Sequence, residues 1–306
     1  ALRIKGETVD EIAGMARGMR NKALAVKLPS NIEALDTCGT GGDHSGTFNI
    51  STAAAFVVAS AGQPVAKHGN RAATSQCGSA DVLEALGARI DLAPDAVTRC
   101  VRATGFGFMF APTYHPAMKY VAPVRREIGI RTVFNILGPL TNPAGVKKQI
   151  LGVAEAALVR PMAQALLLLG VERALVVHGE DGVDEISLSG PTRVAEVHGA
   201  TNQIIEYTLT PAELGLATAP REALKGGDAK TNALILRGVL AGEIADARAD
   251  VVCLNAGAAL FVADKAASLR DGIALARAQR RPDRALRSLG AFVALSQDLA
   301  VAAERE

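Results

Sequence analysis

The sequence has no tryptophan, and aromatic residues make up only 4% of its 306 residues. Proteins that bind single-stranded nucleic acid stack the bases on aromatic side chains, and such a platform has little material here. An excess of one charge is also lacking, because 33 lysines and arginines stand against 31 aspartates and glutamates, for a net charge of +2. This balance excludes a protein that coats nucleic acid or an acidic membrane, so we expect neither partner.

Cysteines are few and far apart. The four, at positions 38, 77, 100 and 253, form no C-x-x-C pair, which excludes a zinc knuckle and a dithiol redox motif. No apolar run approaches the ~18 residues of a membrane span, and the start of the chain has no apolar signal core. We therefore expect reduced, buried thiols in a cytoplasmic protein.

Strand, loop and helix signals alternate along the first part of the chain. An amphipathic helix is predicted over 8–26, where Thr8 and Glu11 have capping-box spacing. A short apolar run, a glycine cluster at 39–46 and a buried helix at 53–61 follow. This alternation favours an α/β fold with a mostly parallel central sheet.

Helical signals return in the middle of the chain, over 115–128. They indicate a small helical domain built from two separated segments beside a larger α/β domain. Towards the C-terminus, the run Val251–Leu254 predicts a strand, and 255–280 and 284–305 predict long helices. The predicted division is 1–31 and 113–142 for the helical domain, and 32–112 and 143–306 for the α/β domain.

A glycine loop between a predicted strand and a predicted helix is the strongest local signal. The run DTCGTGGD at 36–43 precedes NIST at 49–52. Such a loop lets backbone N–H groups crowd around a phosphate. It is neither a Walker loop nor the dinucleotide fingerprint, because no GxxxxGK[ST] occurs and His44 stands where the third glycine would be. Its two aspartates would repel a bare phosphate and favour a metal or a sugar hydroxyl, while an ordinary tight turn is the alternative.

Two further charged segments end or follow predicted strands. The run KHGNR at 67–71, with small and hydroxyl residues after it, is typical of phosphate binding, and a solvated basic turn is the alternative. Four carboxylates within residues 180–185 suggest a hard cation such as Mg²⁺, with a solvated acidic turn as the alternative. Loops at the carboxyl ends of parallel strands gather at one edge, so we expect these segments to meet.

A fourth signal combines FAPTYHP at 110–116 with the arginine pair at 125–126. A guanidinium can hold a carboxylate through two parallel hydrogen bonds, so Arg125 is a candidate for binding one, and an exposed arginine is the alternative. No G-x-S-x-G elbow occurs, so serine hydrolase chemistry has no support.

Together these segments resemble the anthranilate phosphoribosyltransferase family. Seven motifs occur in the family's order and spacing and extend the resemblance over essentially the whole chain. The matching segments are 36–43, 49–52, 67–71, 78–81, 125–129, 135–143 and 182–185.

The resemblance implies a small helical domain and a larger α/β domain, the fold shared with pyrimidine-nucleoside phosphorylases. It implies transfer of the phosphoribosyl group of 5-phosphoribosyl 1-pyrophosphate to anthranilate, with release of pyrophosphate, in tryptophan biosynthesis. It also implies a homodimer in the full-length protein and a pair of Mg²⁺ ions bound with the pyrophosphate. No catalytic base stands out, which fits an arylamine that is already a competent nucleophile and needs mainly positioning.

The family's binding residues carry over position by position. Mg²⁺ would be held by Ser51, Asp184 and Glu185, and anthranilate would contact Gly39, His68, Asn70, Pro112, Tyr114 and Arg125. Two departures are Gln76, where lysine is common, and Thr74, where serine is common; family members also carry residues before the point matching Ala1 that help to build the dimer. The donor would contact Gly39, Gly42, Asp43, Thr47, Asn49, Ile50, Ser51, Thr52, Lys67, His68, Gly69, Asn70, Arg71, Ala72, Ala73, Thr74, Ser75 and Ser79.

Two other functions remain open. A pyrimidine-nucleoside phosphorylase-like enzyme would need a bare phosphate site, whereas Asp184 and Glu185 with Ser51 favour pyrophosphate with Mg²⁺. A non-enzymatic nucleic-acid-binding relative of the same fold should carry a basic stripe, and the balanced charge argues against it.

Overall fold

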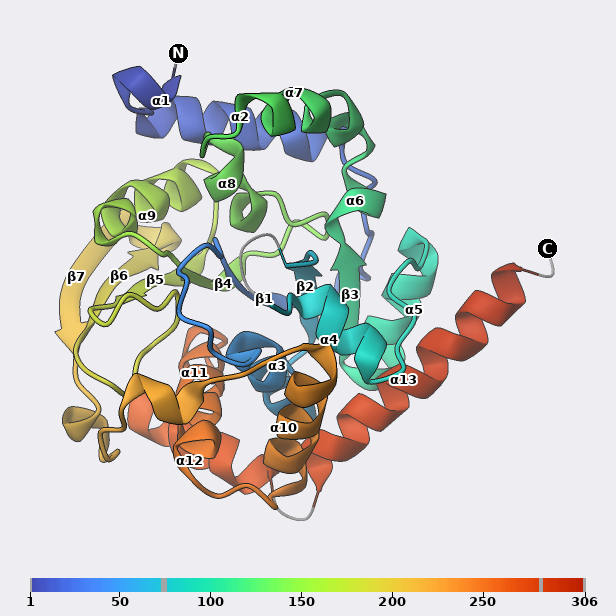
Figure 1. The fold of residues 1–306 in the computed structure, drawn as a ribbon, viewed down its shortest axis with the longest axis vertical. Helices are drawn as coiled ribbons and strands as arrows, with labels where there is room; N and C mark the ends of the chain where they lie inside the picture. The colour runs from blue at the N-terminus through green and yellow to red at the C-terminus, as the bar shows by residue number, and fades with distance from the viewer. Residues whose placement is uncertain (1, 73–75, 281–282, 305–306) are drawn as a thin grey trace.

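The computed structural model describes residues 2–72, 76–280 and 283–304. At its centre lies a seven-stranded sheet with the strand order β3-β2-β1-β4-β5-β6-β7 (Figure 1). Neighbouring strands from β3 to β5 are parallel, and β6 and β7 add an antiparallel hairpin at one edge. The prediction of a mostly parallel sheet is therefore confirmed. The strands are β1 (Leu35–Gly39), β2 (Val65–Gly69), β3 (Phe106–Phe110), β4 (Lys148–Gly152), β5 (Arg173–Gly179), β6 (Thr192–His198) and β7 (Gln203–Leu209).

Helices cover both faces of this sheet (Figure 1). Short 3₁₀ turns connect them: η1 (Pro116–Tyr120), η2 (Gly138–Leu140), η3 (Ala156–Leu158), η4 (Gly199–Thr201), η5 (Ala212–Leu214) and η6 (Arg221–Leu224). The α-helices are α1 (Leu2–Lys5), α2 (Val9–Lys22), α3 (Ile50–Ser60), α4 (Ser79–Ala85), α5 (Pro94–Thr104), α6 (Ala111–Tyr114), α7 (Ala122–Ile128), α8 (Phe134–Leu137), α9 (Val159–Leu168), α10 (Ala229–Ala241), α11 (Ala247–Val262), α12 (Leu269–Gln279) and α13 (Arg284–Ala303).

The sheet separates two hydrophobic clusters. In β5, Leu175 and Val177 face the larger cluster, which includes α3, α10, α11 and α13, whereas Ala174 and Val176 face a smaller one with α2, α8 and α9. Side chains of a strand alternate between faces, so a strand that is apolar throughout is one covered on both. The burial of both faces leaves only the strand ends free to form a site.

The first predicted helix is confirmed, but it is shorter than expected. Its capping box is present, with the Glu11 N–H donating to Thr8 Oγ1 over 3.3 Å. The helix ends at Lys22 rather than at 26, because the next backbone N–H groups bond to distant parts of the chain instead. The N–H groups of Leu24 and Val26 donate to Tyr114 and Pro143 carbonyls, respectively.

The helix predicted over 115–128 is two pieces, η1 and α7. Pro123 lies in the first turn of α7, and a proline has no N–H with which to continue a preceding helix. Together with α1 and α2, these pieces form the small helical domain beside the larger α/β domain. The boundaries at 31/32, 112/113 and 142/143 stay a prediction.

The strand predicted at Val251–Leu254 is wrong, because these residues lie inside α11. Of the 16 residues of α11, 12 are buried and none is exposed, so its sequence shows no amphipathic period, and the valine pair mimics a strand. The N-cap Asp246, whose side chain accepts the N–H of Arg248, marks the true start of this helix. The predicted helix over 255–280 is correspondingly two helices, α11 and α12.

The last helix, α13, is long and apolar enough to cross a membrane by length and composition, contrary to the expectation from the sequence. A helix of a protein core passes the same test, and 33% of this stretch is buried inside the structure. Phe292 of α13 lies edge-on to Phe106 of β3, with ring centroids 4.8 Å apart, and close to Phe56 of α3. This contact makes α13 part of the larger hydrophobic cluster.

Candidate active site

The predicted site segments meet at the carboxyl edge of the parallel strands. The chain adds β2 and β3 on one side of β1 and later β4 and β5 on the other, and ligands of open α/β sheets bind where the strand order reverses in this way. The loops after β1 and β4 are joined directly. The Thr40 N–H donates to the Gly152 carbonyl over 2.9 Å, and the Ala154 N–H donates to Thr40 Oγ1 over 3.2 Å.

The acidic loop after β5 folds back over the ends of β1 and β4. A Cβ atom on Gly39 would collide with the Asp184 carboxylate, and one on Gly152 would collide with the Asp184 carbonyl. In the glycine loop itself, Gly41 and Gly42 have positive φ angles of 65° and 74°, which L side chains rarely adopt. The Gly41 N–H donates to Asp184 Oδ2 over 2.8 Å. Glycine is therefore required here by both close approach and backbone conformation.

Three carboxylates, Asp43, Asp184 and Glu185, gather beside this loop. The Asp184 N–H lies 3.4 Å from Asp43 Oδ2, and the Ser51 N–H at the start of α3 donates to Glu185 Oε1 over 3.1 Å. Burial, and then the Asp43 charge, raise the pKa of Asp184 to about 7. Burial, and then the Asp184 charge, raise the pKa of Glu185 to about 8. Too little positive charge faces this acidic cluster, so it favours a proton or a cation.

These residues fit Mg²⁺ only together with a substrate. Among the described residues, no group of three or more His, Cys, Asp and Glu side chains is arranged to hold a metal by itself. Mg²⁺ normally binds through one or two carboxylates plus waters and substrate phosphates. Asp184 and Glu185, with the Ser51 hydroxyl nearby, supply oxygen donors of the preferred kind.

Lys67, at the centre of β2, is buried beneath this cluster. Its ammonium donates to the Thr37 carbonyl and lies 3.4 Å from Ser51 Oγ. Its charge lowers the pKa of Glu185, against the effect of burial. The structure thus places Lys67 behind the start of α3, as a fixed positive charge under the acidic cluster.

Asp36 and Asn142 also belong to this network. The sequence grouped Asp36 with Asp43 as a loop aspartate that favours a metal or a sugar hydroxyl, but the structure buries Asp36 inside β1; Asn142 was assigned no role. Asp36 is fully buried, and its two oxygens accept hydrogen bonds from the His68 N–H and the Asn142 side-chain amide, the latter over 2.8 Å. Asn142 donates in addition to the Ala66 carbonyl. This pair ties β1 and β2 to the connector 138–143. A buried aspartate inside a strand motif was the only sequence signal for it.

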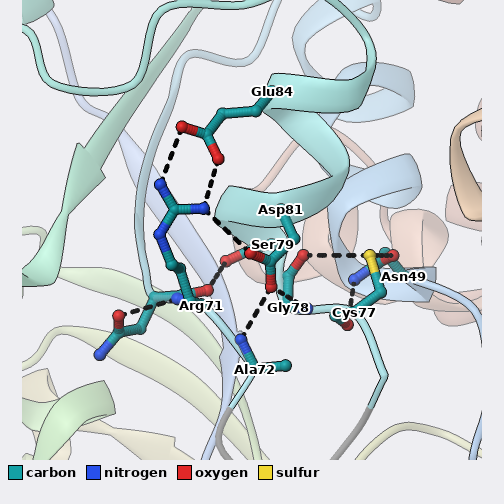
Figure 2. Close-up of polar contacts among 9 residues, drawn as sticks. Asn49, Arg71, Ala72, Cys77, Gly78, Ser79, Asp81 and Glu84 are labelled. Carbon is teal, nitrogen blue, oxygen red and sulfur yellow. Dashed lines mark hydrogen bonds and ion pairs between the residues drawn. The ribbon is translucent and has the colours of Figure 1, made fainter. Parts of the chain in front are cut away.

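The loop after β2 is closed by Asp81 of α4, as Figure 2 shows. Asp81 Oδ2 accepts the N–H of Ala72 over 2.9 Å and that of Gly78 over 2.8 Å. Arg71 donates to Asp81 Oδ1 over 3.1 Å and pairs with both oxygens of Glu84. These carboxylates raise the pKa of the Arg71 guanidinium. The positive charge of Arg71 is therefore already balanced by Asp81 and Glu84. That Arg71 binds a phosphate stays a prediction.

Other predicted donor residues lie around this loop. Ser79 Oγ donates to the Asn70 carbonyl over 3.3 Å, and a Cβ atom on Gly69 would collide with Ser79 Oγ. Ala73, Thr74 and Ser75 lie outside the described residues.

The segment before α3 is held by α10, which sequence reasoning did not connect to the site. The Asn49 amide donates to the Cys77 carbonyl over 3.1 Å, and Asn232 of α10 donates to Asn49 Oδ1 over 3.0 Å. Thr47 forms a β-bridge with Lys225. No local motif marks Asn232, because its partner lies far away in the sequence.

At the start of α3, Ile50 and Thr52 are both buried. The Ile50 side chain belongs to the larger hydrophobic cluster, so a substrate contact there would come from its backbone. Thr52 Oγ1 has no hydrogen-bond partner among the described residues.

On the predicted acceptor side, two histidines face each other. His68 Nε2 lies 3.2 Å from His115 Nε2, and His68 Nδ1 lies 3.2 Å from the Gly138 carbonyl. A ring nitrogen beside a carbonyl is the protonated one, so His68 Nε2 accepts the proton of His115. Burial, and then the His115 charge, lower the pKa of His68 to about 3. His68 is therefore neutral at pH 7.

Tyr114 and Pro112 belong to α6, directly after β3. Tyr114 is fully buried, and its hydroxyl donates to the Leu92 carbonyl over 2.8 Å. The Tyr114 hydroxyl therefore points into the core. A contact between the rest of Tyr114 and anthranilate stays a prediction, but the hydroxyl has no part in it.

Arg125 of α7 is partly buried. Its Nη2 lies 3.4 Å from Asn135 Oδ1, and its guanidinium lies 5.6 Å from the centre of the Phe134 ring. A second arginine that the sequence did not single out, Arg131, has its Nη2 3.3 Å from where a Gly42 Cβ would be. The second helical segment therefore reaches the glycine loop.

Two protein-family models match this chain. Residues 31–285 match the model described as the glycosyl transferase family, a/b domain, and residues 1–23 match the helical bundle domain of the same family. A seven-stranded sheet with a site at its switch point and a small helical domain beside it is thus a glycosyl transferase architecture.

Individual relatives make the family specific. An anthranilate phosphoribosyltransferase of Rubrobacter xylanophilus is 57% identical over 98% of this chain and 86% of the relative. The crystal structure of the Thermus thermophilus enzyme is similar with a TM-score of 0.91 and 50% identity, over 97% of this chain and 87% of that one. The Saccharomyces cerevisiae enzyme in complex with PRPP and Mg has a TM-score of 0.90 at 31% identity, over 97% and 83% of the two chains. The chain belongs to the anthranilate phosphoribosyltransferase family.

Proposed function

We propose that this chain transfers the phosphoribosyl group of 5-phosphoribosyl 1-pyrophosphate to the amino group of anthranilate and releases pyrophosphate, a step of tryptophan biosynthesis. The observation that carries this proposal is the acidic cluster. Asp184 and Glu185 bond to the N–H groups of Gly41 in the glycine loop and Ser51 in α3, at the switch point of the sheet. Carboxylates beside N–H groups suit a polyphosphate that arrives with a divalent cation.

On the donor side, Ser51, Asp184 and Glu185 would hold a pair of Mg²⁺ ions with the pyrophosphate. When bound, Mg²⁺ offsets the negative charge that builds on the departing pyrophosphate. The glycine-loop N–H groups and the start of α3 bind the phosphate oxygens, and buried Lys67 places a fixed positive charge behind them. Lys67 and the loop backbone are held by the fold before substrate arrives, whereas Asp184 and Glu185 exchange their bonds to the Gly41 and Ser51 N–H groups for the metal when the donor binds.

On the acceptor side, Arg125 would bind the anthranilate carboxylate, and Asn70 would orient the ring. His68 is neutral at pH 7 and offers no positive charge to compete with Arg125. The amine is a competent nucleophile, so these residues act by holding it beside the sugar carbon, and no base is assigned.

A nucleoside phosphorylase activity is not favoured. Phosphorolysis needs a bare phosphate beside the sugar, and the acidic cluster would repel it. A nucleic-acid-binding relative should carry a basic stripe and a basic balance, and the near balance of lysines and arginines with acidic residues argues against that role. The partners proposed are the two small-molecule substrates, with no nucleic acid and no membrane.

We further propose a cytoplasmic homodimer. Large apolar side chains are exposed on the helical segments, which is typical of a surface covered by protein. They are Ile4, Tyr120, Val124, Ile128 and Ile130.

The test is to mix the protein with anthranilate, phosphoribosyl pyrophosphate and Mg²⁺ and to follow the loss of anthranilate fluorescence. Transfer should require all three components. Release of a free base from a nucleoside and phosphate, without transfer to anthranilate, would contradict the proposal.

A further inference from the structure

The arginines around the site differ in what holds them. Arg71 is paired with the carboxylates of Asp81 and Glu84 (Figure 2). An arginine whose charge is matched by protein carboxylates has little left to offer to a substrate anion.

Arg131 is also paired with a carboxylate, whereas Arg125 has only neutral partners among the described residues. Arg131 Nη1 lies 2.9 Å from Glu155 Oε1. The contacts of Arg125 are a neutral carboxamide, that of Asn135, and the face of the Phe134 ring. Within residues 2–72, 76–280 and 283–304, no carboxylate forms an ion pair with Arg125. Arg125 is thus oriented by neutral groups and keeps its charge.

One side-chain oxygen of Asn135 contacts both the Arg125 guanidinium and the backbone of Thr132. Asn135 Oδ1 accepts the Thr132 N–H over 2.9 Å and also lies 3.4 Å from Arg125 Nη2. The bond to Thr132 fixes the start of the turn that leads into α8, and Arg131, one residue earlier, reaches Gly42 in the glycine loop. Asn135 therefore links the Arg125 guanidinium to the segment that touches the donor loop.

We propose that Asn135 is a positioning residue that holds Arg125 ready for the acceptor's carboxylate without neutralising it. The inference rests on the proposed function, in which Arg125 binds that carboxylate. An aspartate at this position would accept the same two hydrogen bonds, but it would form an ion pair with Arg125 and compete with the substrate. The neutral carboxamide therefore orients Arg125 without cancelling its charge.

The decisive variant is Asn135→Asp, because it keeps both hydrogen bonds that Oδ1 accepts and replaces the neutral NH₂ group by a charged oxygen of similar size. We expect the KM for anthranilate to rise at least about tenfold, while the KM for phosphoribosyl pyrophosphate and the melting temperature stay near those of the wild type. Asn202→Asp is the matched control, because it adds the same charge in the exposed turn between β6 and β7 and should leave both KM values unchanged.

A double-mutant cycle separates positioning from a structural role. Asn135→Ala alone should raise the KM for anthranilate about three- to tenfold, and Arg125→Ala alone at least about tenfold. If Asn135 acts through Arg125, then Asn135→Ala in the Arg125→Ala background should add almost nothing. Multiplication of the two effects, or an equal rise in both KM values, would overturn the inference.

The outcomes also separate this inference from the proposed function. No transfer by the wild type, or a silent Arg125→Ala variant, would overturn the acceptor assignment and the inference with it. A strong Arg125→Ala effect with a silent Asn135→Asp variant would overturn the inference alone.

Discussion

The donor edge and the acceptor side of this site are built in different ways. The donor edge is formed by strand ends and by loops that bond to one another, with Lys67 buried and Asp184 and Glu185 partly buried and bonded to backbone N–H groups. The acceptor side is formed by short pieces of helix, where Arg125 is partly buried and has neutral partners. The donor groups are thus fixed by the fold itself, whereas the acceptor groups depend on a few individual contacts.

Substitutions in the two regions should therefore affect different properties of the protein. A change at the donor edge should disturb stability, metal affinity and catalysis together, because the same residues serve all three. A change on the acceptor side should alter the KM for one substrate and little else.

Gly152→Ala should have the largest effect. Its new methyl group would collide with the Asp184 backbone, which must shift and take the carboxylate with it. We expect kcat/KM to fall by more than about a hundredfold and the free energy of unfolding to fall by about 1–3 kcal/mol. Steady-state kinetics and urea unfolding measure both.

Gly190→Ala is the control for this change. Gly190 lies in the connection between β5 and β6, and a Cβ atom there would meet open space. Its free energy of unfolding should change by less than about 0.5 kcal/mol. Equal damage from both variants would show that the close approach at Gly152 does not matter.

The double variant Asp184→Asn with Glu185→Gln should be more stable than the wild type at pH 8 without Mg²⁺. Folding raises both carboxyl pKa values, to about 7 and about 8, so the folded protein binds more protons than the unfolded chain over this range. The wild type therefore loses stability as the pH rises from about 4.5 to 8, by on the order of a few kcal/mol, and the variant escapes this loss. Urea unfolding at pH 5 and pH 8 tests it, and a stability difference that does not grow with pH would contradict it.

Asp81→Ala should have an intermediate effect. It removes the acceptor of the Ala72 and Gly78 N–H groups, which close the loop after β2. We expect the KM for phosphoribosyl pyrophosphate to rise roughly three- to tenfold, with the KM for anthranilate unchanged. Glu84→Ala is the control, because it breaks only an exposed ion pair with Arg71 and should change either KM less than about twofold. The reverse ranking would place the important contact at Glu84.

Tyr114→Phe should have the smallest effect on catalysis. The Tyr114 hydroxyl donates to the Leu92 carbonyl inside the core and is therefore not directed at the anthranilate site. We expect the free energy of unfolding to fall by about 1 kcal/mol, with the KM for anthranilate changed less than about twofold. A larger rise in this KM would restore the hydroxyl as an acceptor contact.

Much of the fold followed from local patterns in the sequence. The capping box at Thr8, the alternation of strands and helices and the glycine loop are all local signals, and the structure has each of them. The strand expected at Val251–Leu254 was wrong because a helix buried on all sides has no amphipathic period. The helix expected over 115–128 failed for a local reason, a proline inside the run.

The site was predictable where it depends on short motifs and not where it depends on distant pairs. Asp184 and Glu185 stand in a recognisable acidic run. The close approach of Asp184 to Gly152, by contrast, exists only because β4 and β5 are adjacent in the sheet. Asn142 and Asn232 are ordinary asparagines in the sequence, and their roles come from partners more than a hundred residues away. Such contacts are set by the tertiary fold, which no local pattern records.

The metal-binding role of Asp184 and Glu185 can be measured by calorimetric titration of phosphoribosyl pyrophosphate into the wild type and into the double variant Asp184→Asn with Glu185→Gln, each with and without Mg²⁺. We expect Mg²⁺ to strengthen binding to the wild type at least about tenfold and to strengthen binding to the variant far less. Equal strengthening in both proteins would contradict this expectation, because Asp184 and Glu185 would then be a solvated acidic turn rather than the metal-binding part of the donor site.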